Sequence, residues 1–175
     1  DIEIATRIQE AFSGPTFRLY TSADVVGVEL GGALKNVIAI AAGVVQGLGL
    51  GNNTMAALIT RGLAEITRLA EVMGAEPRTM SGLAGMGDLI TTCVSGYGRN
   101  RRVGERLGRG ESLAQILEGM EAVAEGVTTA RSVFEISEQE GIETPIISEV
   151  YRVLFEKKSA ADATNSLMLR PLRAE

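Results

Sequence analysis

The feature that most limits the fold is one long apolar stretch near the start of the chain. Val25–Gly47 consists mostly of Val, Leu, Ile, Ala and Gly, and Lys35 stands in its middle. A stretch of this length and composition predicts a helix that is buried in the core. An ammonium group among apolar neighbours loses hydration, so it must be paired, reach water, or take part in chemistry. The composition leaves open whether Lys35 lies on the wet stripe of a half-buried helix.

The overall composition excludes several classes of protein. With 175 residues, 45% of them hydrophobic, the chain is large enough for one domain with a hydrophobic core. Its net charge of −5 argues against general attraction to nucleic acid or to an anionic membrane. The chain has no His, so His-containing catalytic triads and the usual zinc ligand sets are excluded, and no metal is expected. The uninterrupted apolar run Val37–Val45 is far shorter than the ~20 residues that span a bilayer, so we expect no membrane span.

The single cysteine bears on the location of the protein, and the first residue bears on whether the chain is part of a longer one. Cys93 cannot form an intrachain disulfide, and a lone cysteine is typical of a reducing compartment, which predicts a cytoplasmic location. The chain opens at Asp1 without an initiator Met and without a signal-peptide pattern, so we expect a piece of a longer protein.

Hydrophobic periodicity predicts a mainly helical fold. Ile4, Ile8 and Phe12 recur at helical spacing, and further amphipathic helices are expected along most of the chain. Phe17–Thr21 alternates between apolar and polar residues and is the only convincing strand. Because a single strand has no partner in its own sequence, we expect it to pair at the edge of a sheet from an upstream region.

Two glycine-rich segments imitate nucleotide-binding loops. Gly47–Gly51 follows an apolar run and precedes an expected helix, but the third glycine of a dinucleotide fingerprint would fall at Asn52. Gly85–Gly87 fails in the same way, with Ile90 at the third position. We therefore interpret these glycines as helix caps and close-packing points, and we expect no dinucleotide-binding fold within this chain.

Three short segments carry polar side chains that suit the binding of a ligand. Asp88 and Thr92 lie four residues apart, on one face of a helix, where they suit an ammonium group and a substrate hydroxyl. Asp88 equally suits a helix cap. Gly96–Arg102 brings three arginines to an expected helix start, where free N–H groups and a guanidinium favour an anion. A solvated basic face capped by Asn100 is the alternative. Glu125, which precedes a glycine, is equally compatible with a surface turn.

Four segments together resemble one enzyme family. They are Gly27–Val37, Gly87–Cys93, Gly98–Arg101 and Val123–Gly126. In sequence and in order they closely resemble NAD(P)-dependent glycerol-3-phosphate dehydrogenase, and the resemblance covers most of the chain. It implies a mainly α, multi-helix domain similar to the C-terminal domain of 6-phosphogluconate dehydrogenase. It also implies that residues 1–22 end an N-terminal Rossmann domain, and that residues 23–175 form the helical substrate-binding and catalytic domain.

The resemblance implies a reaction and a set of site residues. The reaction is reduction of dihydroxyacetone phosphate to sn-glycerol 3-phosphate for glycerophospholipid synthesis, with NAD or NADP bound mainly by the absent N-terminal domain. Lys35 matches the catalytic lysine, which protonates the ketone oxygen as hydride arrives. The implied substrate contacts are Lys35, Asn36, Asp88, Thr92, Gly98, Arg99 and Asn100, and the implied cofactor contacts are Arg99, Val123 and Glu125. Many bacterial members have Ser in place of Gly98, so that hydroxyl contact is lost here or replaced by a backbone N–H.

Two other interpretations stay open at this point. The Val25–Gly47 helix also suits the core of a helical dimerisation module without a catalytic role, and a homodimer is compatible with either interpretation. A related hydroxyacid dehydrogenase or ketopantoate reductase would share the helical domain but not a preference for a phosphorylated substrate. Convergence of Lys35, Asp88 and Arg99 would favour the enzymatic interpretation. The partners expected are then a small phosphorylated substrate and the Rossmann domain, with no nucleic acid, and the chain alone is expected to be inactive.

Overall fold

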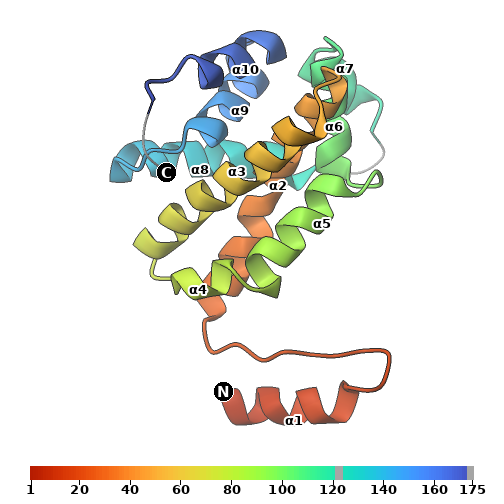
Figure 1. Ribbon diagram of the computed structural model, residues 1–175, viewed down its shortest axis with the longest axis vertical. Helices are drawn as coiled ribbons and strands as arrows, with labels where there is room; N and C mark the ends of the chain where they lie inside the picture. Colours follow the sequence, from red (N-terminus) through yellow and green to blue (C-terminus); the bar gives the residue numbers. More distant parts are fainter. Residues whose placement is uncertain (121–123, 173–175) are drawn as a thin grey trace.

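The computed structural model describes residues 1–120 and 124–172, and their regular secondary structure is helical, as predicted. The π-helix is η1 (Leu83–Gly87), and the α-helices are α1 (Ile2–Phe12), α2 (Val25–Gly47), α3 (Asn52–Val72), α4 (Pro77–Met80), α5 (Asp88–Val94), α6 (Arg99–Gly108), α7 (Leu113–Glu118), α8 (Glu125–Glu140), α9 (Pro145–Phe155) and α10 (Ala160–Met168). In Figure 1, α2 runs through the middle of the helical body, and α1 lies apart from it. The specific likeness to 6-phosphogluconate dehydrogenase stays a prediction.

Helix α2 forms the centre of the core. Its first turn is capped by Asp24, whose carboxylate accepts a hydrogen bond of 2.8 Å from the backbone N–H of Gly27. Every residue of Val37–Val45 is buried, and α3, α5, α6, α8 and α9 pack against α2. This all-round burial explains why Val37–Val45 is apolar on every face of the helix.

By length and composition alone, α2 would also be able to cross a membrane. Its most apolar window of 18 residues has a mean hydropathy of 1.6, although half of that window is buried inside the protein. The short length of the uninterrupted apolar run Val37–Val45 is therefore not what distinguishes α2 from a membrane helix. The distinguishing observation is that other helices of the same chain cover it.

Helices α2 and α6 approach so closely that their backbones touch. A Cβ atom added to Gly43 of α2 would lie 2.0 Å from a carbonyl oxygen of α6, and one added to Gly104 of α6 would lie 1.8 Å from a carbonyl oxygen of α2. Only glycine fits at either position. Consequently Arg99, at the start of α6, is held on a helix that is packed directly against the helix that carries Lys35.

The glycine-rich segments act as helix ends and packing points, as the sequence predicts. Gly49 has a φ of 69°, in the left-handed region that favours glycine, between the end of α2 and Gly51, the residue before α3. Gly85 lies in η1, where an added Cβ would be 2.1 Å from the carbonyl oxygen of Met80. Neither segment forms a dinucleotide loop.

The predicted strand is absent from the structure. Phe17–Thr21 is irregular, and the described residues form no other strand with which it could pair. Because a strand is stabilised by ladder hydrogen bonds to a neighbour, alternation in the sequence does not suffice to form one. The segment instead receives a hydrogen bond of 2.8 Å from the side chain of Gln9 to the carbonyl oxygen of Leu19. Helix α1 buries no residue, and the assignment of residues 1–22 to another domain stays a prediction.

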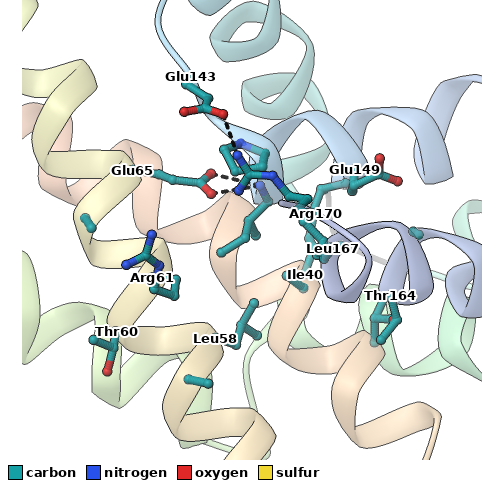
Figure 2. A pocket seen from close by; sticks show the side chains of 18 of the residues that line it. Ile40, Leu58, Thr60, Arg61, Glu65, Glu143, Glu149, Thr164, Leu167 and Arg170 are labelled. Carbon is teal, nitrogen blue, oxygen red and sulfur yellow. Dashed lines mark hydrogen bonds and ion pairs between the residues drawn. The ribbon is translucent and has the colours of Figure 1, made fainter. Parts of the chain in front are cut away.

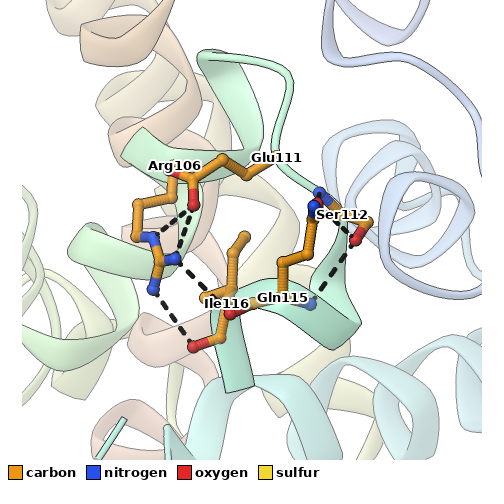
Figure 3. A network of polar contacts seen from close by, with 5 residues as sticks. All are labelled: Arg106, Glu111, Ser112, Gln115 and Ile116. Carbon is orange, nitrogen blue, oxygen red and sulfur yellow. Dashed lines mark hydrogen bonds and ion pairs between the residues drawn. The ribbon is translucent and has the colours of Figure 1, made fainter. Parts of the chain in front are cut away.

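A polar network attaches the short helix α7 to α6 (Figure 3). Arg106 of α6 donates two hydrogen bonds to Glu111, of 2.9 and 2.5 Å, and one of 3.1 Å to the carbonyl oxygen of Ile116. Ser112 and Gln115 form a reciprocal capping box at the start of α7. The pairing with Glu111 raises the pKa of Arg106 and lowers that of Glu111. This network is structural, and none of its residues is among the predicted site residues.

Candidate active site

Lys35 lies mostly inside the protein and forms an ion pair with Asp88. The Lys35 side chain is 19% exposed and that of Asp88 is 39% exposed, and the ammonium donates a hydrogen bond to Asp88 Oδ2. Asp88 is the first residue of α5 and directly follows η1. The pair is therefore shielded on the side of Lys35 and reachable from solvent on the side of Asp88. Lys35 therefore does not lie on the solvent-exposed face of a half-buried helix.

Thr92 lies one turn after Asp88 on the same helix, as the four-residue spacing predicts. Its hydroxyl donates a hydrogen bond of 2.7 Å to the backbone carbonyl of Asp88 and lies 3.4 Å from Asp88 Oδ1. Helix α5 has no side-chain cap. The interpretation of Asp88 as a helix cap is therefore wrong, because its carboxylate is directed to Lys35.

A directed chain of amide hydrogen bonds connects three helices beside Lys35. The backbone N–H of Gly126 donates to Asn100 Oδ1 at 2.9 Å. Asn100 Nδ2 donates to Asn36 Oδ1 at 2.9 Å, and Asn36 Nδ2 donates to the carbonyl oxygen of Gly32 at 3.2 Å. Asn100 is only 8% exposed. It does not cap its own helix, α6, whose preceding residue is Gly98, and instead satisfies an N–H at the start of α8.

The arginines that cluster in the sequence diverge in the structure. Arg99 Nη2 lies 3.5 Å from Glu125 Oε1, and the two side chains are 52% and 65% exposed. Arg101 Nη2 instead donates to Gln46 Oε1 at 3.3 Å, near the C-terminal end of α2. Of these two arginines, Arg99 therefore reaches the start of α8 and Arg101 does not. The binding of an anion by this segment stays a prediction.

Gly98, the residue before α6, lies between the contacts of Lys35 on α5 and the contacts of Arg99 on α8. A Cβ added to Gly98 would lie 3.6 Å from the carbonyl oxygen of Thr92. Gly98 thus stands beside the helix that pairs with Lys35, and it directly precedes Arg99. Of the predicted site residues, Val123 lies outside the described residues; the roles of the others in binding or catalysis stay predictions.

The arrangement combines a protected cation with amide donors and an exposed guanidinium. Asp88 keeps the Lys35 ammonium in place, while Asn36 and Asn100 contribute N–H groups that suit an oxyanion. Within the described ranges, no group of three or more His, Cys, Asp or Glu side chains is arranged to hold a metal ion. This set of groups suits proton transfer to an oxygen of a bound anionic substrate.

Comparison with known proteins identifies the family. A family model described as the NAD-dependent glycerol-3-phosphate dehydrogenase C-terminus matches residues 24–165. The chain belongs to this glycerol-3-phosphate dehydrogenase family. The family suggested by the four sequence segments is thereby confirmed.

Whole glycerol-3-phosphate dehydrogenases are longer than this chain. The chain is 57% identical over 175 residues to glycerol-3-phosphate dehydrogenase [NAD(P)+] of Geobacter metallireducens, and covers 52% of that protein. It is 57% identical over 173 residues to the Myxococcus xanthus protein of the same name, again covering 52%. The chain therefore spans about half the length of the curated relatives it matches.

Solved structures of the glycerol-3-phosphate dehydrogenase family share the fold. The crystal structure of the enzyme from Coxiella burnetii superposes with a TM-score of 0.91 at 39% identity, covering 97% of this chain and 52% of that one. The enzyme from Saccharomyces cerevisiae superposes with a TM-score of 0.83 at 31% identity, covering 92% of this chain and 47% of that one.

This glycerol-3-phosphate dehydrogenase domain also has a cavity away from Lys35. The cavity, of about 940 Å³, is lined by residues of α2, α3, α9 and α10 and includes none of the predicted site residues (Figure 2). Glu65 of α3 lies at its wall, is 2% exposed, and accepts hydrogen bonds from the backbone N–H groups of Ile146 and Ile147 at 2.9 to 3.1 Å. Burial raises the pKa of Glu65 to about 7, while these hydrogen bonds act in the opposite direction. Glu65 was not among the predicted residues, although its place beside Ile66 and four residues before Leu69 was a signal in the sequence that it faces the core.

Proposed function

We propose that the protein containing this domain reduces dihydroxyacetone phosphate to sn-glycerol 3-phosphate with NADH or NADPH, for glycerophospholipid synthesis in the cytoplasm. Family membership supports the reaction class. The names of the relatives, which include both NAD and NADP, support the choice of cofactor. A free and buried Cys93 is compatible with a reducing compartment.

Lys35 is the proposed proton donor. Reduction adds hydride to the ketone carbon while negative charge develops on the ketone oxygen, and one proton must reach that oxygen to give the alcohol. An ammonium that is largely shielded from water and held by Asp88 is suited to donate this proton. Thr92 is proposed to orient the Asp88 end of the pair.

The start of α6 is the proposed phosphate site. Arg99 supplies a guanidinium that is paired only loosely with Glu125, so a dianion can replace this pairing with stronger bonds. Asn36 and Asn100 supply amide N–H groups, and Gly98 leaves the backbone of the first turn accessible. Together these donors would hold the phosphate while Lys35 serves the ketone.

The nicotinamide cofactor, when bound, supplies the hydride. Arg99 and Glu125 form an exposed, charged edge at the starts of α6 and α8, and this edge fits a dinucleotide that is held mainly by another domain. Val123 is proposed as a further contact by resemblance. A homodimer stays a prediction.

The observation that carries the proposal is the Lys35–Asp88 ion pair beside the Asn36–Asn100 hydrogen bond. The test is NADH and NADPH oxidation by the full-length protein, with dihydroxyacetone phosphate and with dihydroxyacetone as substrates. We expect activity only with the phosphorylated ketone. For Lys35→Ala we expect kcat to fall by about 10²- to 10⁴-fold, the usual contribution of a positioned proton donor, with unchanged folding.

Lys157→Asn is the matched control for Lys35→Ala. It also removes a lysine charge, and Asn tolerates the φ of 57° that Lys157 adopts after α9. This variant should keep normal kcat. Near-normal turnover in Lys35→Ala would refute the proposed proton donor, and equal activity on both ketones would refute the phosphate site and favour a related hydroxyacid dehydrogenase.

A further inference from the structure

Gly126, at the start of α8, stands where the contacts of the proposed site meet. It is buried, and its backbone N–H donates to Asn100 Oδ1 at 2.9 Å. An added Cβ would lie 2.7 Å from the carbonyl oxygen of Asn36 and 2.8 Å from Asn100 Oδ1. Both distances are too short for any side chain, so a glycine is needed for α8 to dock against α2 and α6 at this point.

The N–H of Gly126 also fixes which way the Asn100 amide faces. Because Oδ1 accepts from Gly126, Nδ2 must turn to Asn36, whose own Nδ2 donates to Gly32. Each amide has two N–H groups, and this chain of hydrogen bonds uses one from each. One N–H of Asn36 and one of Asn100 are not used in this chain of hydrogen bonds, and an N–H donor suits an anionic ligand and disfavours a cationic one.

Glu125, the neighbour of Gly126, connects this position to Arg99. Glu125 directly precedes Gly126 and lies 3.5 Å from Arg99. The position of Gly126 against Asn36 thus sets how far Glu125 and Arg99, the proposed cofactor edge, stand from the amides of the proposed phosphate site. A shift of α8 at this point moves both sets of contacts relative to Lys35.

We propose that Gly126 is a positioning residue of this site: through its N–H and its missing side chain it orients the Asn100 amide and holds the Glu125–Arg99 pair in register with Asn36. The proposal rests on the proposed function. Gly126 acts through Asn100 and Asn36 and touches neither substrate nor cofactor.

The test is a double-mutant cycle in the full-length protein. Gly126→Ala, Asn100→Ala and the double variant are compared by kcat/KM for dihydroxyacetone phosphate and for dihydroxyacetone. We expect Gly126→Ala alone to lower kcat/KM for the phosphorylated ketone by about 10- to 100-fold, as a misplacement of about 1 Å does. In the Asn100→Ala background we expect it to cost roughly threefold or less, because residues that act through one another are not additive.

Gly62→Ala is the matched control. On α3, an added Cβ at Gly62 would lie 2.8 Å from the side chain of Ile38, so the overlap is similar in size but falls on an apolar side chain that is not among the proposed contacts. We expect Gly62→Ala to lower the thermal stability and to leave the preference for the phosphorylated ketone unchanged. Gly126→Ala should reduce that preference at a comparable loss of stability.

The outcomes separate this inference from the proposed function. An inactive wild-type protein overturns both. An active wild type with a Gly126→Ala variant that keeps kcat/KM and substrate preference within about twofold overturns the positioning role alone. So does a Gly126→Ala effect that is equally large with and without Asn100, or a Gly126→Ala protein that is unfolded by circular dichroism at 25 °C, since either result assigns Gly126 to the fold only.

Discussion

Two charged side chains on neighbouring helices of the core, Lys35 and Glu65, are buried in opposite ways. Lys35 of α2 is 19% exposed at its side chain and has the Asp88 carboxylate, itself 39% exposed, as its ionic partner. Glu65 of α3 is 2% exposed and accepts three hydrogen bonds from two backbone N–H groups at the start of α9. Solvent can approach Lys35 from the side of Asp88, whereas protein atoms enclose Glu65.

The difference shows how the surroundings of a buried ionisable group indicate whether it stabilises the fold or transfers a proton. A buried polar group that stabilises a fold is expected to have its hydrogen bonds filled by groups that cannot move away, such as the N–H groups at the N-terminus of a helix. A charge that transfers a proton must keep an exchangeable partner and an open side. Glu65 satisfies the first description and Lys35 satisfies the second, and each can be tested by a substitution that affects only its own region.

Asp88→Asn tests the open pair and should have the largest effect. The substitution keeps the shape of the side chain but removes the charge that holds the Lys35 ammonium in place. We expect kcat for dihydroxyacetone phosphate to fall by about 10²-fold in the full-length protein, because a misplaced donor loses its alignment. Steady-state kinetics measures this, and thermal unfolding should show little change. A kcat within about twofold of the wild type would remove Asp88 from the site.

Arg99→Ala tests the exposed end of the same region. Loss of one charged hydrogen-bonding group costs about 1.5–3 kcal/mol, so we expect KM for dihydroxyacetone phosphate to rise by about 10- to 100-fold with a smaller effect on kcat. Arg101→Ala is the control, because Arg101 bonds Gln46 and not the start of α8. An unchanged KM in Arg99→Ala, or an equal rise in both variants, would contradict the phosphate site.

Glu65→Leu tests the closed region. It leaves the N–H groups of Ile146 and Ile147 without an acceptor, so we expect a loss of about 2 kcal/mol in the free energy of unfolding, or about 4–8 °C in Tm. Thermal unfolding of the 175-residue chain measures this. Glu71→Leu, an exposed position on the same helix, should change stability by less than about 0.5 kcal/mol. Equal effects of the two variants would show that Glu65 does not hold α9.

The pH dependence of stability sharpens the comparison further. Burial raises the pKa of Glu65 to about 7 from an ordinary value of 4.5, so between these values the folded state binds more protons than the unfolded state. Raising the pH through this window therefore destabilises the fold, by on the order of 3 kcal/mol at most, and no further loss is expected above about pH 7. The difference in unfolding free energy between wild type and Glu65→Gln, measured from pH 4 to pH 8, isolates this contribution. A difference that does not vary with pH would contradict it.

The fold could be predicted well wherever the pattern was local. Apolar residues at helical spacing, and the glycines that end helices, depend on contacts within a few residues, and the mainly α architecture follows from them. The strand at Phe17–Thr21 was not confirmed, because strand formation depends on a partner that alternation cannot supply. The partners of the arginines could not be predicted for a related reason: residues two positions apart on a helix point in different directions, and Arg99 and Arg101 reach different partners.

The sequence by itself determined that one lysine stands in an apolar helix and that Asp88 and Thr92 share a face, since helix geometry fixes both. Only the tertiary structure decided which groups those side chains meet. Asp88 pairs with Lys35 and does not cap its own helix, because α5 packs against α2. Asn100 bonds Gly126 and Asn36, because close glycine contacts bring α2, α6 and α8 within hydrogen-bonding distance of each other. Contacts between residues more than 50 positions apart depend on how whole helices pack, and no local pattern in the chain encodes them.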